Sequence, residues 1–423
     1  MRPKGSTRRT VRVARTGRPG EPTARATAAR WAVAVATAWA AALAALATVP
    51  APAQAQTQQR AQTQQRAQTQ QRAQAQTQAQ AQAQTQGQTQ GQTQGRDGGA
   101  PHWESKDTGT ADVRYRGLAA VSRGTAWVAG TGGTVLRTTD GGSTWRDVSP
   151  PDTTDLQFRD IEAFDARRAV VLAIGEGEAS RVYRTDDGGA TWTESFRNTD
   201  ARAFYDCLAF FDSRNGLAMS DPVDGKFRIL STRDGGRSWK VLPDTGMPPA
   251  QQGEAGFAAS GQCLVTAGSR DVWMATGGAA RARVLHSADR GLTWTATDSP
   301  LPAGDPARGV FALAFRDRTH GLAVGGDYRP DQASPRAGAR TTDAGRTWRP
   351  AATPPPAYRS GVAWLPHSRT TALAVGPTGT DLTTDAGRTW RTVDQGSYDT
   401  VDCTPDLGCW AAGEKGRVAR LER

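Results

Sequence analysis

Six aspartates recur along the chain within one short pattern, Thr/Ser-x-Asp-x-Gly-x-Thr/Ser-Trp. Carboxylates repeated in this way could ligate metal ions or act as general acids and bases. Every copy, however, also has the same glycine two positions after the aspartate and the same tryptophan five positions after it. The aspartates are Asp140, Asp187, Asp234, Asp289, Asp343 and Asp385, and they lie 47, 47, 55, 54 and 42 residues apart.

The constant neighbours favour a structural turn over catalysis or metal binding. An aspartate in this position accepts hydrogen bonds from backbone N–H groups further along a tight turn. Glycine supplies a positive φ at low steric cost, and the hydroxyl residue and tryptophan then begin the next strand. Short β-rich runs precede the turns, such as Thr134–Arg137 and Arg181–Arg184. Each copy therefore predicts a β-hairpin formed by the third and fourth strands of a repeated unit.

A period of 42 to 55 residues is typical of the blades of a propeller. Two more apolar runs precede each motif, for example Leu208–Phe211 and Gly216–Met219, which gives four strands per unit. A seventh unit at Thr400–Leu421 lacks the motif and stops after three strands. His102–Ser105 reads like a missing fourth strand, and borrowing it would remove exposed sheet edges. We predict an all-β fold, a seven-bladed β-propeller of four-stranded antiparallel blades over residues 101–423, with the last blade closed by an N-terminal strand.

The repeated motif resembles the Asp-box, also called the BNR repeat, of sialidases and related β-propellers. Within that superfamily the chain looks most like the photosystem II stability/assembly factor-like propellers and their non-photosynthetic bacterial relatives, over about residues 101–423. The resemblance implies a binding or assembly role, although some bacterial relatives are labelled oxidoreductases. The segments that carry it are Phe204–Phe211, Ser220–Phe227, Gly253–Gly261 and Gly413–Arg417.

The first hundred residues differ in composition from the rest. Residues 1–30 hold nine basic residues and one acid, and an apolar stretch at Trp31–Val49 and small residues at Ala51–Ala53 follow. This order predicts a signal peptide over residues 1–53, or a retained signal anchor as the alternative. Residues 54–100 are rich in Gln, Ala and Thr and predict a disordered linker. We therefore expect an exported protein that is extracellular, on the cell surface or periplasmic, with the membrane involved only if the anchor is retained.

The net charge of +11 belongs to this leader and linker. Residues 1–96 contain 13 basic residues and one acid, which leaves 39 basic and 40 acidic residues in the remainder. A nearly neutral propeller does not have the basic surface that nucleic-acid binding would require overall. We expect no nucleic-acid partner.

Four cysteines in an exported chain permit disulfides. Cys403 and Cys409 flank a short turn, while Cys207 and Cys263 occupy matching places in adjacent blades. Each pair could form a disulfide, or its members could serve as small apolar packing residues. None has the spacing of metal ligands and the four histidines are scattered, so neither a metal nor a cofactor is expected.

Propeller geometry indicates where a ligand would bind. The aspartate turns join the third and fourth strands, and they lie on the face opposite the starts of the innermost strands. Those strand starts, and the turns between second and third strands, should bring polar side chains to one mouth of the central channel, where they could bind a ligand. The alternative is that these charged side chains are simply solvated by water in the loops. The predicted ligand-binding residues are Arg116, Asp206, Asp221, Asp224, Glu254, Asp327, Arg359, Glu414 and Lys415, and the wider set includes Arg159, Tyr358 and Asp399.

Three functions compete on this sequence. The first is a monomeric binding or assembly module that holds a protein or carbohydrate partner in the cell envelope, with no catalytic residues. The second is a sialidase-like glycoside hydrolase, but Phe227–Leu230 lacks the proline of the sialidase Phe-Arg-Ile-Pro segment and does not precede the first motif. The third is an oxidoreductase with a cofactor at the channel mouth, although the chain has no Gly-x-Gly-x-x-Gly dinucleotide motif and no Cys-x-x-Cys. We favour the first.

Overall fold

The computed structural model describes residues 101–329, 332 and 334–422. All described residues belong to one compact unit, Arg96–Arg423. The expected signal peptide or anchor at 1–53 and the linker at 54–100 lie outside the described residues.

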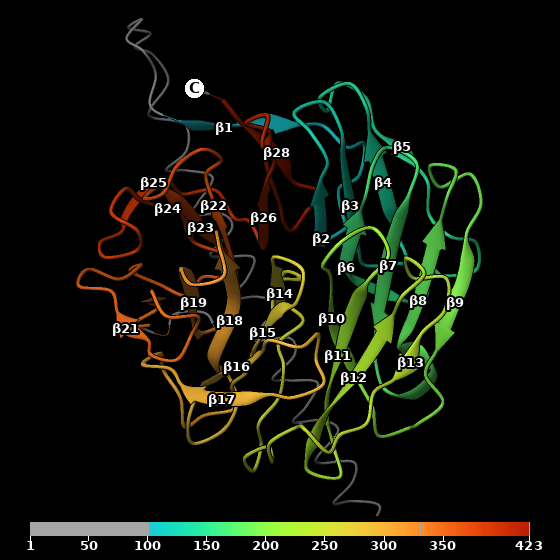
Figure 1. Ribbon diagram of the computed structural model, residues 1–423. Coiled ribbons are helices and arrows are strands. Elements are labelled where there is room, and N and C mark those ends of the chain that lie inside the picture. The colour runs from blue at the N-terminus through green and yellow to red at the C-terminus, as the bar shows by residue number, and fades with distance from the viewer. Residues whose placement is uncertain (1–100, 330–331, 333, 423) are drawn as a thin grey trace, which may run out of the picture. The chain divides into compact units, whose positions relative to one another are not determined.

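Seven four-stranded antiparallel sheets follow one another along the chain and form the blades of a β-propeller (Figure 1), which confirms the predicted fold. Blades 1 to 6 each consist of four consecutive strands, from innermost to outermost. Blade 1 contains β2 (Tyr115–Ala120), β3 (Ala126–Gly130), β4 (Val135–Thr138) and β5 (Arg146–Asp147), and blade 2 contains β6 (Gln157–Ala163), β7 (Ala169–Ile174), β8 (Arg181–Thr185) and β9 (Thr193–Arg197). Blade 3 contains β10 (Tyr205–Phe210), β11 (Gly216–Val223), β12 (Lys226–Thr232) and β13 (Lys240–Val241), and blade 4 contains β14 (Leu264–Ala267), β15 (Asp271–Ala275), β16 (Arg283–Ser287) and β17 (Thr295–Asp298). Blade 5 contains β18 (Arg308–Phe315), β19 (Gly321–Asp327), β20 (Gly338–Thr341) and β21 (Arg349–Pro350), and blade 6 contains β22 (Gly361–Trp364), β23 (Ala372–Gly376), β24 (Gly379–Thr383) and β25 (Arg391–Asp394). A short 3₁₀ helix, η1 (Gly177–Ala179), precedes β8.

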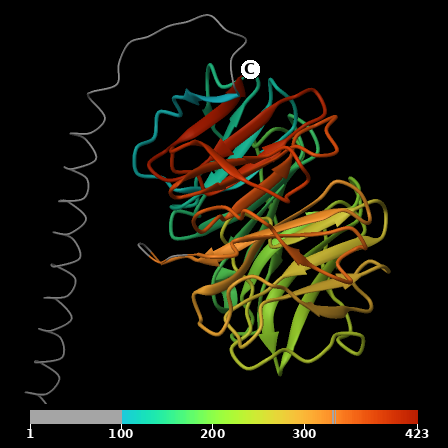
Figure 2. The same ribbon diagram turned by 90° about the vertical axis from the view of Figure 1, so that its left-hand side faces the viewer.

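Blade 7 joins the two ends of the propeller. It contains β26 (Thr400–Cys403), β27 (Cys409–Ala412), β28 (Val418–Glu422) and, as its outermost strand, β1 (His102–Lys106). β1 pairs antiparallel with β28, with Trp103 opposite Leu421, and Figure 2 shows this blue strand against the red C-terminal blade. The Trp103 ring packs 5.5 Å from Tyr398, and its Nε1 donates a hydrogen bond to Thr380 Oγ1 in blade 6 at 3.0 Å. The predicted closure by an N-terminal strand is confirmed.

The six aspartate turns share one hydrogen-bond pattern. In the first, Asp140 Oδ1 accepts from the backbone N–H of Thr144 at 2.9 Å, and its Oδ2 accepts from the Thr144 hydroxyl at 2.6 Å. The Thr138 hydroxyl accepts from the N–H of Gly142, whose φ is 83°. These bonds lower the pKa of Asp140 to about 2. The aspartates therefore fix the turns between third and fourth strands.

The hydrophobic core lies between neighbouring blades. The three inner strands of a blade are almost wholly buried, since each of their faces packs against an adjacent sheet, whereas the two-residue outer strands are exposed. Large aromatic residues on the second strands, such as Trp127 and Trp410, are fully buried. The tryptophans that end the first two turns reach back to the preceding blade: Trp145 packs edge-on against Trp410 and Trp192 against Trp127.

Removing β1 should destabilise the whole propeller. A chain that begins at residue 107 loses Trp103 and leaves the edge of β28 unpaired. Losing a packed tryptophan costs about 3–5 kcal/mol, so the melting temperature should fall by roughly 10 °C. The control is a chain that begins at residue 101 and keeps β1. Equal melting temperatures in circular dichroism would show that ring closure does not depend on this strand.

Candidate functional site

A cavity of about 590 Å³ opens where the innermost strands begin, at the predicted channel mouth. Charged and aromatic side chains from several blades line it. The charged residues are Arg114, Arg116, Arg159, Asp206, Asp221 and Asp399, and the aromatic residues are Phe204, Phe257, Phe311, Tyr328 and Tyr358. The size of this mouth cavity suits a small molecule or a short peptide segment.

Arginines from blades 1 and 2 form one side of the mouth cavity. Arg114 donates two hydrogen bonds to Asp399, at 2.6 and 2.7 Å, so this pair is satisfied. Arg116 lies 3.9 Å from the same carboxylate, and its buried Nε has no acceptor among the described residues. Arg159 Nη1 donates to the carbonyl of Ala258 at 3.0 Å, but its Nε also lacks an acceptor there. Burial lowers the pKa of Arg116. This side of the cavity presents donors that are free to bind an anionic or carbonyl oxygen.

Two carboxyl groups from blade 3 form a second side. Asp206 lies on β10 and Asp221 on β11, and Asp206 is almost completely buried. The backbone N–H of Gly256 donates to Asp221 Oδ1 at 2.7 Å. Burial raises the pKa of both groups, that of Asp221 to about 6. The cavity thus contains basic and acidic groups in separate places.

Aromatic rings from blades 5 and 6 and the loop before β14 complete the wall. Phe257 stacks on Phe311 with ring centroids 3.9 Å apart, and Tyr358 meets Phe311 edge-on at 4.7 Å. Tyr328 stands at the outside and is 52% exposed. Burial raises the pKa of the Tyr358 hydroxyl, which therefore stays protonated at neutral pH. Such a wall provides apolar area to a ligand that the arginines orient.

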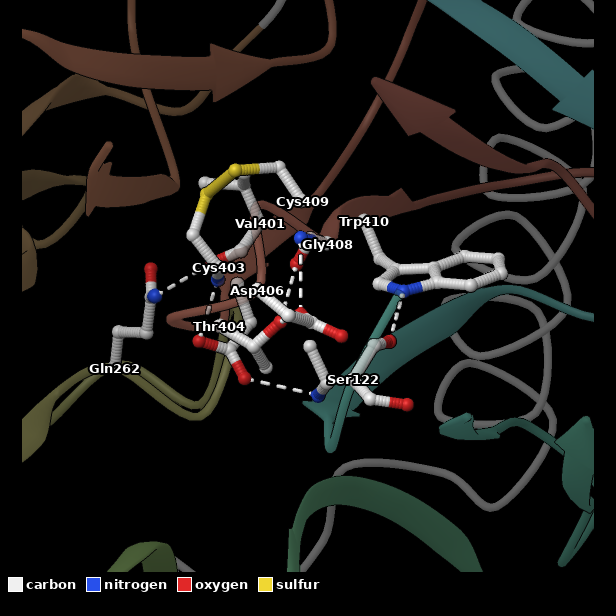
Figure 3. Close-up of a disulfide and its surroundings, with 11 residues drawn as sticks. Ser122, Gln262, Val401, Cys403, Thr404, Asp406, Gly408, Cys409 and Trp410 are labelled. Atoms are coloured by element: carbon white, nitrogen blue, oxygen red, sulfur yellow. Dashed lines mark hydrogen bonds between the residues drawn. A yellow bond between two sulfur atoms is a disulfide. The ribbon is translucent and has the colours of Figure 1, made fainter. Parts of the chain in front are cut away.

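The floor of the mouth cavity is a segment that crosses the central channel. Residues 256–262, here called the channel plug, precede β14 and contact the innermost strands of other blades. The carbonyl of Ser260 accepts from the hydroxyl of Thr400 at 3.1 Å, and the side chain of Gln262 donates to the carbonyl of Val401 at 2.8 Å and accepts from the N–H of Val362. Figure 3 shows Gln262 beside Val401. The plug therefore closes the channel below the mouth.

The described residues contain two disulfides. Cys207 on β10 joins Cys263, the residue that follows the plug, with Cα atoms 6.0 Å apart. Cys403 joins Cys409 across the turn between β26 and β27 (Figure 3). The first ties the plug to the blade that carries both carboxyl groups, which constrains the cavity floor and its acidic side together.

A second cavity of about 300 Å³ lies on the other side of the plug, toward the ends of the innermost strands. Asp160, Glu162 and Asp402 line it, and burial raises the pKa of all three. Asp160 and Asp402 accept backbone hydrogen bonds from Leu208 and Ala120. Across residues 101–329, 332 and 334–422, no group of His, Cys, Asp or Glu side chains has the arrangement of a metal site.

The predicted ligand-binding residues fall into three groups in the structure. Arg116, Asp206 and Asp221 line the mouth cavity, as do Arg159, Tyr358 and Asp399 of the wider set. The turns between second and third strands carry the partly or fully exposed Asp224, Glu414 and Lys415, which do not line it. Glu254, Asp327 and Arg359 are buried and also lie outside the lining.

Buried ion pairs explain why these last three do not face the cavity. Glu254 binds Arg283 and accepts a hydrogen bond from Thr276 at 2.6 Å. Arg359 donates from Nε to Asp381 at 2.6 Å, and neither side chain is more than 1% exposed. Asp327 similarly binds Arg308 at 3.0 Å and Arg329. Groups that are fully paired and buried act within the scaffold and are not available to a ligand.

Several lining residues were not among the predicted ones. Arg114 lies one residue before β2 begins, and alternation along an extended chain would have placed it and Arg116 on the same face. Phe257 and Phe311 reach the cavity because of the plug and its stacking. No periodic signal in the sequence predicts a segment that leaves its own blade.

The described part of the chain contains no helix with the length and apolar character of a membrane span. This finding concerns residues 101–329, 332 and 334–422 alone.

Comparisons with known proteins agree with this architecture. A family model described as photosynthesis system II assembly factor YCF48 matches residues 78–202. A solved structure of YCF48 bound to D1 peptide is 14% identical, with a TM-score of 0.54 over 76% of this chain and 95% of that chain. YCF48 from Cyanidioschyzon merolae is 16% identical, with a TM-score of 0.53 over 76% and 98%. A streptogramin B lyase is 11% identical, with a TM-score of 0.54 over 76% and 97%. No curated protein matches the chain.

The structural likenesses define the class of protein, a seven-bladed β-propeller, and at these identities they show the fold alone. That class includes a lyase, so it does not by itself decide function. Together with the family model, they confirm the resemblance predicted from the sequence, to the photosystem II assembly factor-like BNR propellers.

Replacing Arg359 and Arg116 by alanine should separate scaffold from site. Arg359→Ala leaves Asp381 buried and unpaired and should cost about 3–5 kcal/mol of unfolding free energy. Arg116→Ala removes a guanidinium whose Nε has no acceptor in the described chain and should change stability by less than about 1 kcal/mol. Urea unfolding of both variants measures the difference. Equal destabilisation would contradict the assignment of Arg116 to the site.

Proposed function

We propose that the protein is an exported binding or assembly module whose mouth cavity holds an exposed segment of a partner protein. The observation that carries the proposal is the chemistry of that cavity. It is open, about 590 Å³ in volume, and places unpaired arginine donors opposite stacked aromatic rings. Peptides carry the carbonyl and carboxylate oxygens that such donors bind and the apolar side chains that such rings pack against.

The peptide complex of a similar propeller supports this choice of partner. YCF48, which shares the fold, has been solved bound to a D1 peptide. A peptide ligand also suits the shape of the site, because the plug closes the cavity below and leaves it open to solvent above. A carbohydrate partner in the cell envelope is the alternative, since aromatic and acidic side chains also bind sugars.

Random peptide selection tests the proposal without knowledge of the partner. The full chain would be panned against a library of random peptides, and the affinity of selected peptides measured by calorimetry. We expect peptides that bind the mouth, and Arg116→Ala should weaken them about tenfold or more, because a charged hydrogen bond contributes about 1.5–3 kcal/mol.

The matched control is Arg237→Ala. Arg237 is an exposed arginine in the third aspartate turn, on the opposite face of the propeller. Its replacement should leave affinity unchanged. Equal loss of peptide affinity in Arg116→Ala and Arg237→Ala would refute a peptide site at the mouth. Binding of polysaccharide fragments but of no peptide would refute it as well.

Export rests on the order of basic, apolar and small residues at the N-terminus. The apolar stretch ends at Val49, and the small residues Ala51–Ala53 follow. If a signal peptidase removes this leader, protein recovered from the native cell should begin near residue 54. N-terminal sequencing of that protein measures the start directly. A protein found in the cytoplasm with its leader intact would contradict export, whereas an intact leader in the membrane fraction would indicate the signal anchor.

A further inference from the structure

Two neighbouring carboxyl groups in the mouth cavity lack a basic partner. Asp206 is 2% exposed and Asp221 lines the same cavity beside it. Gly256 N–H occupies Asp221 Oδ1 at 2.7 Å. Asp206 Oδ2 is buried and has no N–H or hydroxyl donor among the described residues. The two carboxyls therefore hydrogen-bond to each other only while they share a proton.

Both carboxyl groups of the pair have raised pKa values. Burial, together with the nearby charge of Asp221, raises the pKa of Asp206 well above its usual value. Burial raises the pKa of Asp221 to about 6. Because the pKa of Asp221 is about 6, lowering the pH from 7 to 5 protonates this group, and the pair loses that negative charge.

The charged groups around the pair form no ion pair with it. Arg159 and Asp160 on β6 bond to Ala258 and Leu208, and Glu254, two residues before the plug, binds Arg283. Across the cavity, Arg114 forms an ion pair with Asp399, and Arg116 Nε lies 3.9 Å from the same carboxylate. Tyr328 and Tyr358 complete the titratable groups of the lining. Within the described ranges, no basic side chain forms an ion pair with Asp206 or Asp221. A desolvated charge without a counter-ion is costly, so the site favours a cation from outside the chain.

We propose that Asp206 and Asp221 form a subsite for a cationic nitrogen of the bound segment, the side chain of a lysine or an arginine. This inference rests on the proposed function, since it names the residue type that the partner presents. Phe204 and Phe257 line the same cavity as the two carboxyl groups. The aliphatic stem of a basic side chain packs on such rings, and its charged end gains a cation–π contact.

The rest of the cavity suits the remainder of the same segment. The unpaired guanidinium groups of Arg116 and Arg159 can donate to a backbone carbonyl or a carboxylate, while the acidic pair requires a positive charge. A neutral amide could donate a hydrogen bond to the pair but would leave its charge uncompensated. The two sides together select a segment with a basic residue close to an acceptor group.

Peptide chemistry tests the subsite on the unaltered full-length protein. Mouth-binding peptides that lack histidine, identified by their loss of affinity for Arg116→Ala, would be resynthesised with each lysine replaced by norleucine and each arginine by citrulline. We expect one such replacement to weaken binding about tenfold or more, the loss of one charged hydrogen-bonded contact. Mouth-binding peptides that contain no basic residue, or tolerate every replacement, overturn the subsite and leave the proposed function intact.

The pH dependence gives an independent readout. A cation binds the ionised pair, so affinity should be about tenfold lower at pH 5 than at pH 7, given one group with a pKa of about 6. Asp221→Asn keeps an acceptor for Gly256 N–H but removes the charge. This variant should bind the peptide weakly at both pH values. Replacing the basic residue of the peptide by citrulline or norleucine should not lower its affinity for this variant any further.

Asp224→Asn serves as the matched control. Asp224 is an exposed acid three residues along, paired with Arg202 at 2.7 Å, and does not line the cavity. Its replacement should leave affinity and pH dependence unchanged. Affinity that is independent of pH in the unaltered protein, or equal effects of Asp224→Asn and Asp221→Asn, overturns the subsite. If no selected peptide depends on Arg116, the proposed function fails, and the subsite falls with it.

Discussion

Closure of the ring is the constraint on which the remaining structure depends. Seven sheets bury their faces only against one another, so a missing strand would expose both a sheet edge and a blade-to-blade surface. The antiparallel pairing of β1 with β28 completes the last blade, and Trp103 extends this closure to Thr380 in blade 6. Because the ring is closed, the innermost strands all begin around one axis. That common origin brings Arg116, Asp206 and Asp399, which are distant in sequence, to one cavity.

Blade 4 departs from this regular plan, and the departure creates the site. The segment before its innermost strand, β14, crosses the channel and contacts other blades. An irregular buried segment must still satisfy its backbone polar groups. The plug does so through the innermost strands of other blades, with Thr400 donating to Ser260 and Arg159 to Ala258. The same bonds divide the channel into two cavities, one with mixed charges and one lined by acids.

Sequence reasoning predicted the fold far better than the site. The repeated Thr-x-Asp-x-Gly-x-Thr-Trp pattern is local, because each aspartate bonds within four residues of itself, and so blade number and the turns could be predicted. The face of the mouth followed from strand direction alone. Which polar side chains are free there depends on partners distant in sequence: Arg359 lies at a strand start as Arg116 does, yet Asp381 binds it. Phe257 was beyond prediction for the same reason, since its position depends on contacts of the plug with other blades.

Hydrogen-bond satisfaction separates the residues that the sequence predicts for the mouth into two groups. Glu254, Asp327 and Arg359 are buried, charged and fully paired, and such groups maintain one geometry. Arg116 Nε and Asp206 Oδ2 are also buried, but the described chain offers neither a partner. Buried polar groups are rarely left unsatisfied unless another molecule or a proton completes them. Arg116 and Asp206 both line the mouth cavity, and their opposite chemistry suits a ligand that brings both an acceptor and a positive charge. A peptide segment meets both requirements at once.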